Sequence, residues 1–189
     1  MRIIPPRPPI RIGEKCYIEA PTRQKMAVYR DFLARNDAYH KPWVFHSFKK
    51  ELYEHYLKRI KRGVLQGCFI IDKQHQNLVG VININNILLG SASRASLGYY
   101  GDAAYAGKGY MSEGMSLALK YAFEDLGLHR LEANIQPENI PSIRLVQKQG
   151  FRKEGFSPKY LQIGGEWRDH ERWAILDEEF AKHKEPLFE

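Results

Sequence analysis

A glycine-containing segment followed by a long amphipathic run constrains the fold of this chain more than any other feature. Residues 105–114 read YAGKGYMSEG, in which two glycines flank a lysine. Glycine adopts the backbone conformations that tight loops need, and a helix N-terminus attracts anions. The segment is therefore either a turn or a loop that holds phosphate. The apolar residues that follow it form one stripe at helical spacing: Met111, Met115, Ala118, Leu119, Ala122, Phe123 and Leu126.

Strand patterns on both sides of this helix indicate a crossover unit. The run ASLGYYGD at 95–102 comes before the loop, and RLEANI at 130–135 comes after the helix. A strand, a helix and a second strand in this order predict a parallel pair. Gly98 lies inside the first strand, where glycine often marks a bulge or a close approach to the backbone.

Two familiar nucleotide-binding loops do not fit these residues. No serine or threonine follows a Gly-Lys pair, so the P-loop pattern is absent, and Gly107 and Gly109 lack the third glycine of the dinucleotide pattern. The sequence thus gives no support to nucleotide hydrolysis or dinucleotide redox chemistry. Backbone N–H groups at the start of the helix can still bind a pyrophosphate.

The remaining segments complete an α+β pattern. Ser47 is expected to cap the second helix, and Pro42 is expected to hold Lys41 in an extended conformation. We predict one domain over residues 1–189, with a mixed, mostly antiparallel central sheet flanked by helices. The expected order is strand 15–20, helices 22–33 and 47–62, strands 68–72, 78–84 and 95–102, helix 111–126, strand 130–135, helix 141–149, and strands 151–163 and 167–176.

Composition limits the classes of binding partner and the cellular compartment that we expect. The formal net charge of +7 over 189 residues favours an anionic partner, such as a phosphate-bearing cofactor, RNA or a ribosomal surface. Cys16 and Cys68 form no CxxC pair and the histidines show no ligand spacing, so no metal is expected. The proline-rich start MRIIPPRPPI has no signal-peptide core, and no 18-residue apolar run occurs. We expect a cytoplasmic protein with no membrane partner.

Three ordered motifs resemble the acetyl-CoA-binding core of the GNAT acyltransferase superfamily. They are LGYY, AGKGYMSEG and NIPSIRLVQKQGF, within a matching region of about residues 68–176. Ala104 stands where the superfamily's loop has arginine or glutamine, although a backbone cradle needs no particular side chain. The resemblance implies the GNAT fold, acetyl-CoA as cosubstrate, and these cofactor contacts: Leu97, Gly98, Tyr99, Ala106, Gly107, Lys108, Gly109, Tyr110, Met111, Asn139 and Ser142.

Further segments are similar to the RimJ-type ribosomal-protein-alanine N-acetyltransferases. They are KPW at 41–43, HRLEANIQPEN at 129–139 and GGEWRDH at 164–170. This similarity implies acetyl transfer to a protein N-terminus, such as that of a ribosomal protein near the ribosome, by a monomer or homodimer without direct DNA contact. An acetyltransferase for polyamines or antibiotics, a non-catalytic CoA sensor and an RNA-binding module stay open as alternatives.

The implied reaction gives roles to a few residues. The resemblance places Ser142 near the thioester sulfur and suggests Glu132 as the base, while Val146 stands where many relatives have a tyrosine acid. A helix-capping role for Ser142 and a solvent-facing position for Glu132 are equally open. An N–H of the strand 98–100 can hold the oxyanion. Asp169 and His170 are adjacent in a strand and are not expected to act as a pair. Candidate acceptor contacts, which could instead fill the core, are Trp43, Tyr100 and Trp167.

Overall fold

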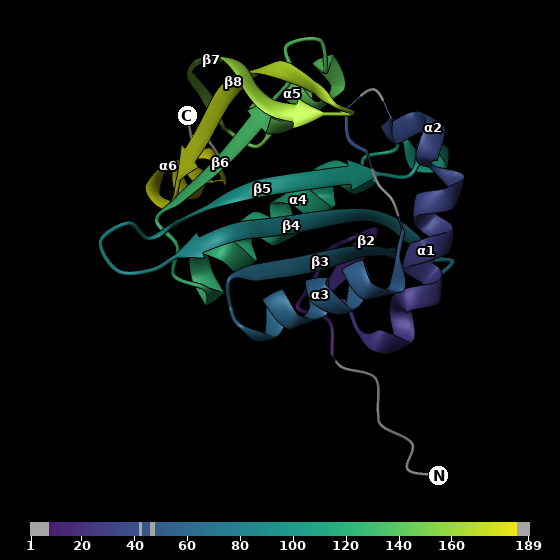
Figure 1. Ribbon diagram of the computed structural model, residues 1–189. Coiled ribbons are helices and arrows are strands. Elements are labelled where there is room, and N and C mark those ends of the chain that lie inside the picture. The colour runs from purple at the N-terminus through teal and green to yellow at the C-terminus, as the bar shows by residue number, and fades with distance from the viewer. Residues whose placement is uncertain (1–7, 42, 46–47, 185–189) are drawn as a thin grey trace.

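One mixed sheet organises the protein. The structure, a computed structural model, describes residues 8–41, 43–45 and 48–184. Within them eight strands follow the order β1-β2-β3-β4-β5-β6-β8-β7, and all neighbours are antiparallel except β5 and β6, which are parallel as predicted (Figure 1). The strands are β1 (Arg11–Ile12), β2 (Cys16–Glu19), β3 (Leu65–Asp72), β4 (Leu78–Leu88), β5 (Arg94–Gly101), β6 (Arg130–Ile135), β7 (Arg152–Ile163) and β8 (Glu166–Leu176).

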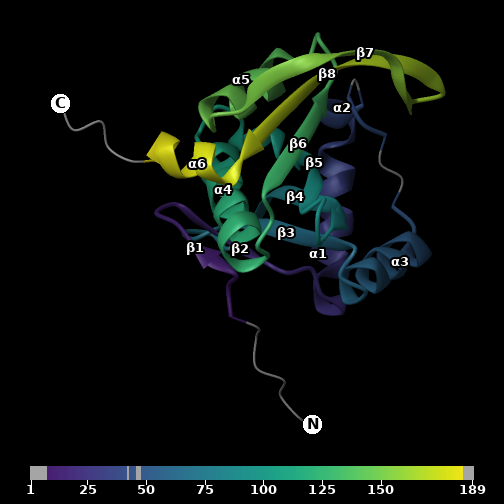
Figure 2. The same ribbon diagram turned by 90° about the vertical axis from the view of Figure 1, so that its left-hand side faces the viewer.

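Helices cover both faces of the sheet. On one face α4 (Tyr110–Lys120) packs over a core that includes Met115 and Leu131, and on the other α1 (Met26–Arg35) and α3 (Lys50–Lys61) pack over a core around Phe69 (Figure 2). No helix in the described ranges has the length and apolarity needed to cross a bilayer. The other helices are α2 (Asp37–His40), α5 (Ile140–Lys148) and α6 (Asp177–Lys184), with a π-helical turn at Tyr121–Asp125 and 3-10 turns at Arg23–Lys25 and Ala103–Tyr105.

The predicted fold class and element order are confirmed, with differences at the element ends. Three further elements, β1, α2 and α6, were not predicted; the first two are only two and four residues long and carry no periodic signal. The predicted extended backbone at Lys41 is wrong. Its φ of −48° and ψ of −37° are helical, and its N–H donates to the Asp37 carbonyl, which closes α2 against the local preference set by a following proline. Ser47 lies outside the described residues, and α3 begins at Lys50.

The sheet opens between its two parallel strands. Pairing of β5 with β6 runs from Arg94 opposite Arg130 to Leu97 opposite Ala133 and ends there, while β5 stays paired with β4 as far as Gly101. The N–H of Asp102 donates to Val79 of β4 at 2.9 Å. Because N–H groups alternate in direction along a strand, the N–H of Tyr99 points away from β4, into the opening. The two parallel strands thus part near the loop, beyond the pair of Leu97 and Ala133.

Candidate functional site

The glycine loop ends in a helix N-terminus with unsatisfied donors. Gly107 and Gly109 have φ values of 72° and 86°, a left-handed conformation that favours glycine. The N–H groups of Ala106 and Lys108 close turns onto Ala103 and Tyr105. In contrast, no residue in the described ranges accepts a hydrogen bond from the N–H of Gly107 or Gly109. Together with the N–H groups of Tyr110, Met111 and Ser112, which precede the first bond of α4 from the Glu113 N–H to the Gly109 carbonyl, these donors can bind an anion.

Arg35, the last residue of α1, and Asn36, which follows it, hold the start of this loop. The Asp102 carboxylate accepts from the Ala104 N–H at 3.0 Å, and the buried Asn36 amide oxygen accepts from the Ala103 N–H at 2.9 Å. Arg35 donates through Nε to Asp102 Oδ2 at 2.8 Å. Sequence reasoning missed Arg35 and Asn36, because no local pattern links them to residues almost 70 positions away.

The turn between β1 and β2 also contacts the loop. Glu113 Oε1 accepts from the Lys15 N–H at 2.9 Å, and the Lys15 ammonium donates to the Lys108 carbonyl at 3.4 Å. Lys15 therefore brings a positive charge to the loop, in which Ala104 offers none. It was not predicted, because the two segments are far apart in the chain.

A cavity of about 1290 Å³ connects the loop with the opening between β5 and β6. Lys108, Tyr110 and Trp167 are not part of its described lining. The Lys108 ammonium lies 5.6 Å from the centre of the Tyr105 ring, and the Tyr110 hydroxyl donates to Asp72 at 3.1 Å. The predicted site residues that do line it are Trp43, Leu97, Gly98, Tyr99, Tyr100, Ala106, Gly107, Gly109, Met111, Glu132, Asn139 and Ser142.

Ser142 hydrogen-bonds a tyrosine hydroxyl across the cavity. Its Oγ lies 2.6 Å from the hydroxyl oxygen of Tyr99. The capping role is taken instead by Asn139, whose side-chain oxygen accepts from the Ser142 N–H at 3.3 Å, so the capping interpretation of Ser142 is wrong. Burial raises the pKa of Tyr99, which keeps its hydroxyl protonated and able to donate. Val146 is fully buried in the core.

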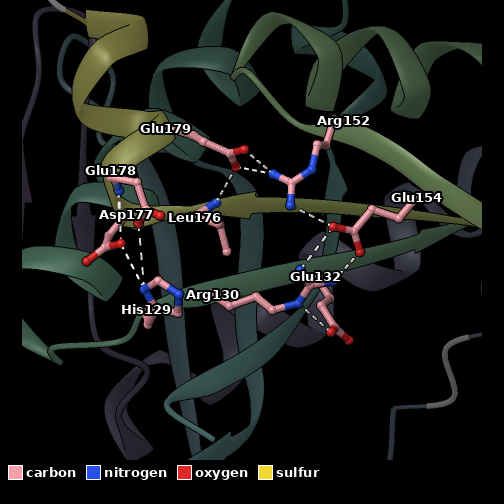
Figure 3. A network of polar contacts seen from close by, with 9 residues as sticks. All are labelled: His129, Arg130, Glu132, Arg152, Glu154, Leu176, Asp177, Glu178 and Glu179. Atoms are coloured by element: carbon pink, nitrogen blue, oxygen red, sulfur yellow. Dashed lines mark hydrogen bonds and ion pairs between the residues drawn. The ribbon is translucent and has the colours of Figure 1, made fainter.

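Glu132 is surrounded by guanidinium groups. Its carboxylate accepts from Arg130 Nε at 2.8 Å and from Arg94 at 3.3 Å, and Arg172 lies 3.7 Å away. Figure 3 shows that Arg130 also reaches Glu154. The solvent-facing interpretation of Glu132 is wrong, since its side chain is only 13% exposed. Its Oε1 thus accepts from two arginines, whereas no residue in the described ranges donates a hydrogen bond to Oε2, and the ion pairs favour a structural role for this carboxylate.

The predicted acceptor contacts divide between the cavity and the surface. Trp43 is half-buried in the lining, and its carbonyl accepts from Gln136 Nε2 at 3.0 Å. Tyr100 lines the cavity as well, and its hydroxyl lies 2.7 Å from that of Tyr29. Trp167 is 60% exposed on β8, so its alternative role in the core is wrong.

Comparison with known proteins agrees with this geometry. Residues 17–152 match the family described as the acetyltransferase (GNAT) domain. The chain belongs to the GNAT acetyltransferase family. It is 38% identical to a probable N-acetyltransferase, YjcK, of Bacillus subtilis over 65% of this chain and 67% of the relative. It is 37% identical to the [ribosomal protein uS5]-alanine N-acetyltransferase of Escherichia coli over 56% of this chain and 55% of that protein.

More distant relatives include enzymes for small amines. A spermidine N(1)-acetyltransferase of Vibrio cholerae is 27% identical over 71% of this chain and 77% of that protein. Among solved structures, Mycobacterium smegmatis RimJ in complex with CoA-disulfide has a TM-score of 0.81, at 24% identity over 90% of this chain and 85% of that one. Some of the curated relatives are thus matched over only about half their length.

The site of this GNAT acetyltransferase fits acetyl-CoA, the cosubstrate of the family. The open N–H groups of the glycine loop suit a pyrophosphate. Pockets for small ligands typically occupy about 300–1,000 Å³. The present cavity is larger, and its lining extends from the loop to Arg59 and Tyr160. It therefore has room for an acceptor beside the cosubstrate.

Two buried histidines of the cavity predict a loss of stability in acid. His40 and His170 are 4% and 3% exposed, and burial lowers the pKa of each below its ordinary value of 6.5. The unfolded chain then binds protons more readily than the folded one, so stability is complete above about pH 6.5 and falls as the pH drops through the folded-state pKa. Urea unfolding should give a lower free energy of unfolding at pH 5 than at pH 7.5.

Two single variants test whether a buried histidine causes this pH dependence of stability. His170→Gln should reduce the difference between the two pH values, whereas His55→Gln, at an exposed position of α3, should leave it unchanged. Equal free energies of unfolding for the native sequence at both pH values would show that these histidines do not resist protonation.

Proposed function

We propose that this GNAT enzyme transfers acetyl from acetyl-CoA to the N-terminal α-amine of a protein. The C–S bond of the thioester breaks as a C–N bond forms, the amine loses one proton, and the departing sulfur gains one. Similarity to the uS5-alanine acetyltransferase supports a ribosomal protein as acceptor. The net charge of +7 suits an acceptor presented on an RNA-rich surface, and so a cytoplasmic site of action.

The positive charge of the cavity lining favours a single α-amine over a polyamine as the acceptor. Its lining includes five basic side chains, Arg59, Arg94, Arg144, Lys148 and Arg172. The carboxylates in the described lining, Asp102 and Glu132, are both ion-paired, with Arg35 at 2.7 Å and with Arg130 at 2.8 Å. A polyamine would meet net repulsion in such a cavity. A single α-amine, which must be neutral to attack, loses much less by entering it.

The α-amine also fits the shortage of strong bases. Its reference pKa is about 7.7–8.0, against about 10.4 for a lysine side chain, so a useful fraction is neutral near pH 7 without enzymatic help. Glu132 remains a candidate for removing the proton that the amine loses, directly or through water. Its carboxylate is paired with Arg130 and Arg94, and Arg172 lies 3.7 Å away, so it would have to give up part of these contacts to take that proton.

The remaining roles fall to backbone and hydroxyl groups. Bound acetyl-CoA supplies the activated acetyl group, and the N–H groups of Gly107 and Gly109 are placed to hold its pyrophosphate. The N–H of Tyr99 points into the opening, where it can donate to the carbonyl oxygen as negative charge develops; such a donor contributes about 2.7–4 kcal/mol. Ser142 and Tyr99 together offer hydroxyl donors for the departing sulfur.

A panel of amines tests the proposal through thiol release from acetyl-CoA. It contains a neutral peptide that begins with alanine, the same peptide with a blocked N-terminus and one internal lysine, and spermidine. We expect kcat/KM for the free α-amine to exceed the other two at least tenfold. Ser142→Ala should slow this release by a larger factor than it weakens CoA binding. A preference for spermidine would overturn the proposed acceptor, since a spermidine acetyltransferase is among the relatives.

A further inference from the structure

Asn134 is the first residue of β6 beyond its pairing with β5. Ser96 lies opposite Glu132 and Leu97 opposite Ala133, and the ladder then ends. Continued by one step, the register places Gly98 across the opening from Asn134. Side chains alternate along β6, so Asn134 shares a face with Glu132, and it lines the cavity.

The side-chain amide of Asn134 takes no part in holding the fold together. Its Oδ1 is enclosed by protein and has no hydrogen-bond partner, and no residue in the described ranges bonds its amide nitrogen. A buried polar atom left without a partner costs about 1–3 kcal/mol. Rotation of the amide by half a turn exchanges its oxygen and nitrogen and breaks no hydrogen bond. The oxygen can therefore turn toward a ligand without breaking a hydrogen bond of the described fold, although the NH2 group then takes the enclosed position.

The space in front of Asn134 is kept open by a glycine. Gly98 and Asn134 both line the cavity, and Gly98 adds no side chain to it; a Cβ there would lie 3.2 Å from Asn85 Nδ2, on the β4 side of β5. The N–H of the next residue, Tyr99, points into the same opening. An amine between Gly98 and Asn134 would thus lie next to the carbonyl that this N–H is placed to polarise.

The charged groups around this space leave few acceptors for an amine. Arg94 and Arg172 offer only donors, and Glu132 is bonded to Arg94 and Arg130 through Oε1 while its Oε2 faces Arg172 at 3.7 Å. Arg172 lies directly opposite Asn134 on β8 and stacks over Tyr160 at 4.9 Å from the ring centre. An amide oxygen is the uncharged acceptor that an incoming N–H needs here.

We propose that Asn134 Oδ1 accepts a hydrogen bond from the attacking amine and orients its lone pair toward the thioester carbonyl. This inference rests on the proposed function only in requiring a primary amine as acceptor. It makes Asn134 a contact of the acceptor and gives it no part in binding CoA.

Three variants of the full chain test this role: Asn134→Ala, Asn134→Leu and Asn134→Asp. Kinetics use the best acceptor of the amine panel, and calorimetry measures the affinity of that acceptor for the protein–CoA complex. We expect the alanine and leucine variants to lose at least tenfold in kcat/KM for the acceptor and in its affinity. CoA affinity should stay unchanged, and the melting temperature should be equal or higher, because an unsatisfied buried atom is removed. Asn134→Asp, which keeps an oxygen acceptor, should retain activity above the alanine variant.

A second asparagine, outside the cavity lining, provides the control. Asn77→Ala removes an exposed amide that bonds only Tyr105 and should match the native kinetics. Native acceptor kinetics in Asn134→Ala would overturn the inference. An inactive but folded Asn134→Asp would also overturn it, because it would indicate that the side-chain amide acts as a hydrogen-bond donor. A lower melting temperature in Asn134→Ala would assign the amide a structural role instead. If the native enzyme prefers spermidine, the proposed acceptor class is wrong, and the same Asn134 variants are then measured with spermidine as the acceptor.

Discussion

Gly109→Asp is expected to weaken CoA binding on the order of 100-fold. The substitution puts a carboxylate beside the N–H groups proposed to hold the pyrophosphate. Two like charges about 5 Å apart repel by about 3 kcal/mol at an effective dielectric constant of about 20. Each 1.4 kcal/mol corresponds to about tenfold in affinity. Aspartate tolerates the left-handed conformation of Gly109, whose φ is 86°, so the variant should fold and can be titrated with CoA by calorimetry.

Two comparisons separate charge from backbone strain. Gly109→Ala introduces a side chain in the same conformation without charge and should lose far less affinity. Gly90→Asp adds the same charge at another left-handed glycine, one with no atoms within 4 Å of its Cβ position, and should bind CoA as the native protein does. Native affinity in Gly109→Asp would mean that the glycine loop does not hold the phosphates.

Phe69→Ala is expected to lower the free energy of unfolding by about 3–5 kcal/mol. Phe69 is fully buried under α1 and α3, and its ring stacks on Tyr29 with 5.4 Å between the centres. The change leaves a cavity beneath Tyr29, whose hydroxyl bonds Tyr100 in the wall of the site. Since domains are stable by about 5–15 kcal/mol, this is a large fraction of the total. Urea denaturation monitored by circular dichroism measures it.

An exposed position provides the matched control. Leu52 on α3 is 54% exposed, so Leu52→Ala should change stability by less than about 0.5 kcal/mol. A loss below 1 kcal/mol in Phe69→Ala would show that the face covered by α1 and α3 contributes little to stability.

The fold could be predicted because its elements carry strong local signals. The apolar stripe from Met111 to Leu126 has the period of a helix with one buried face, and its last part is a π-helical turn. The β-branched runs of β3 and β4 specify strands in the same way. The short elements β1 and α2 escaped prediction because so few residues show no periodicity. The helical backbone at Lys41 was not predicted because the hydrogen bond that closes α2 outweighs the preference of a residue before proline for an extended conformation.

The site was predictable only where the chain itself carries the function. The glycine loop is proposed to bind phosphate through backbone N–H groups, and its left-handed conformation favours glycine, so the residue types themselves point to that role. Side chains that act through distant partners leave no such trace. Ser142 meets Tyr99 over 43 positions of sequence, and Asn36 holds Ala103 over 67. The arginines around Glu132 come from three different strands, so no local pattern reveals them.

The sequence by itself determined the crossover, the helix and the glycine loop between them, because hydrophobic periodicity and glycine conformation are local properties. Tertiary structure decided where β5 and β6 part, which charges surround the acceptor, and that the amide of Asn134 is left without partners. Those features depend on which strands become neighbours, and long-range pairing places residues beside one another that no local pattern relates.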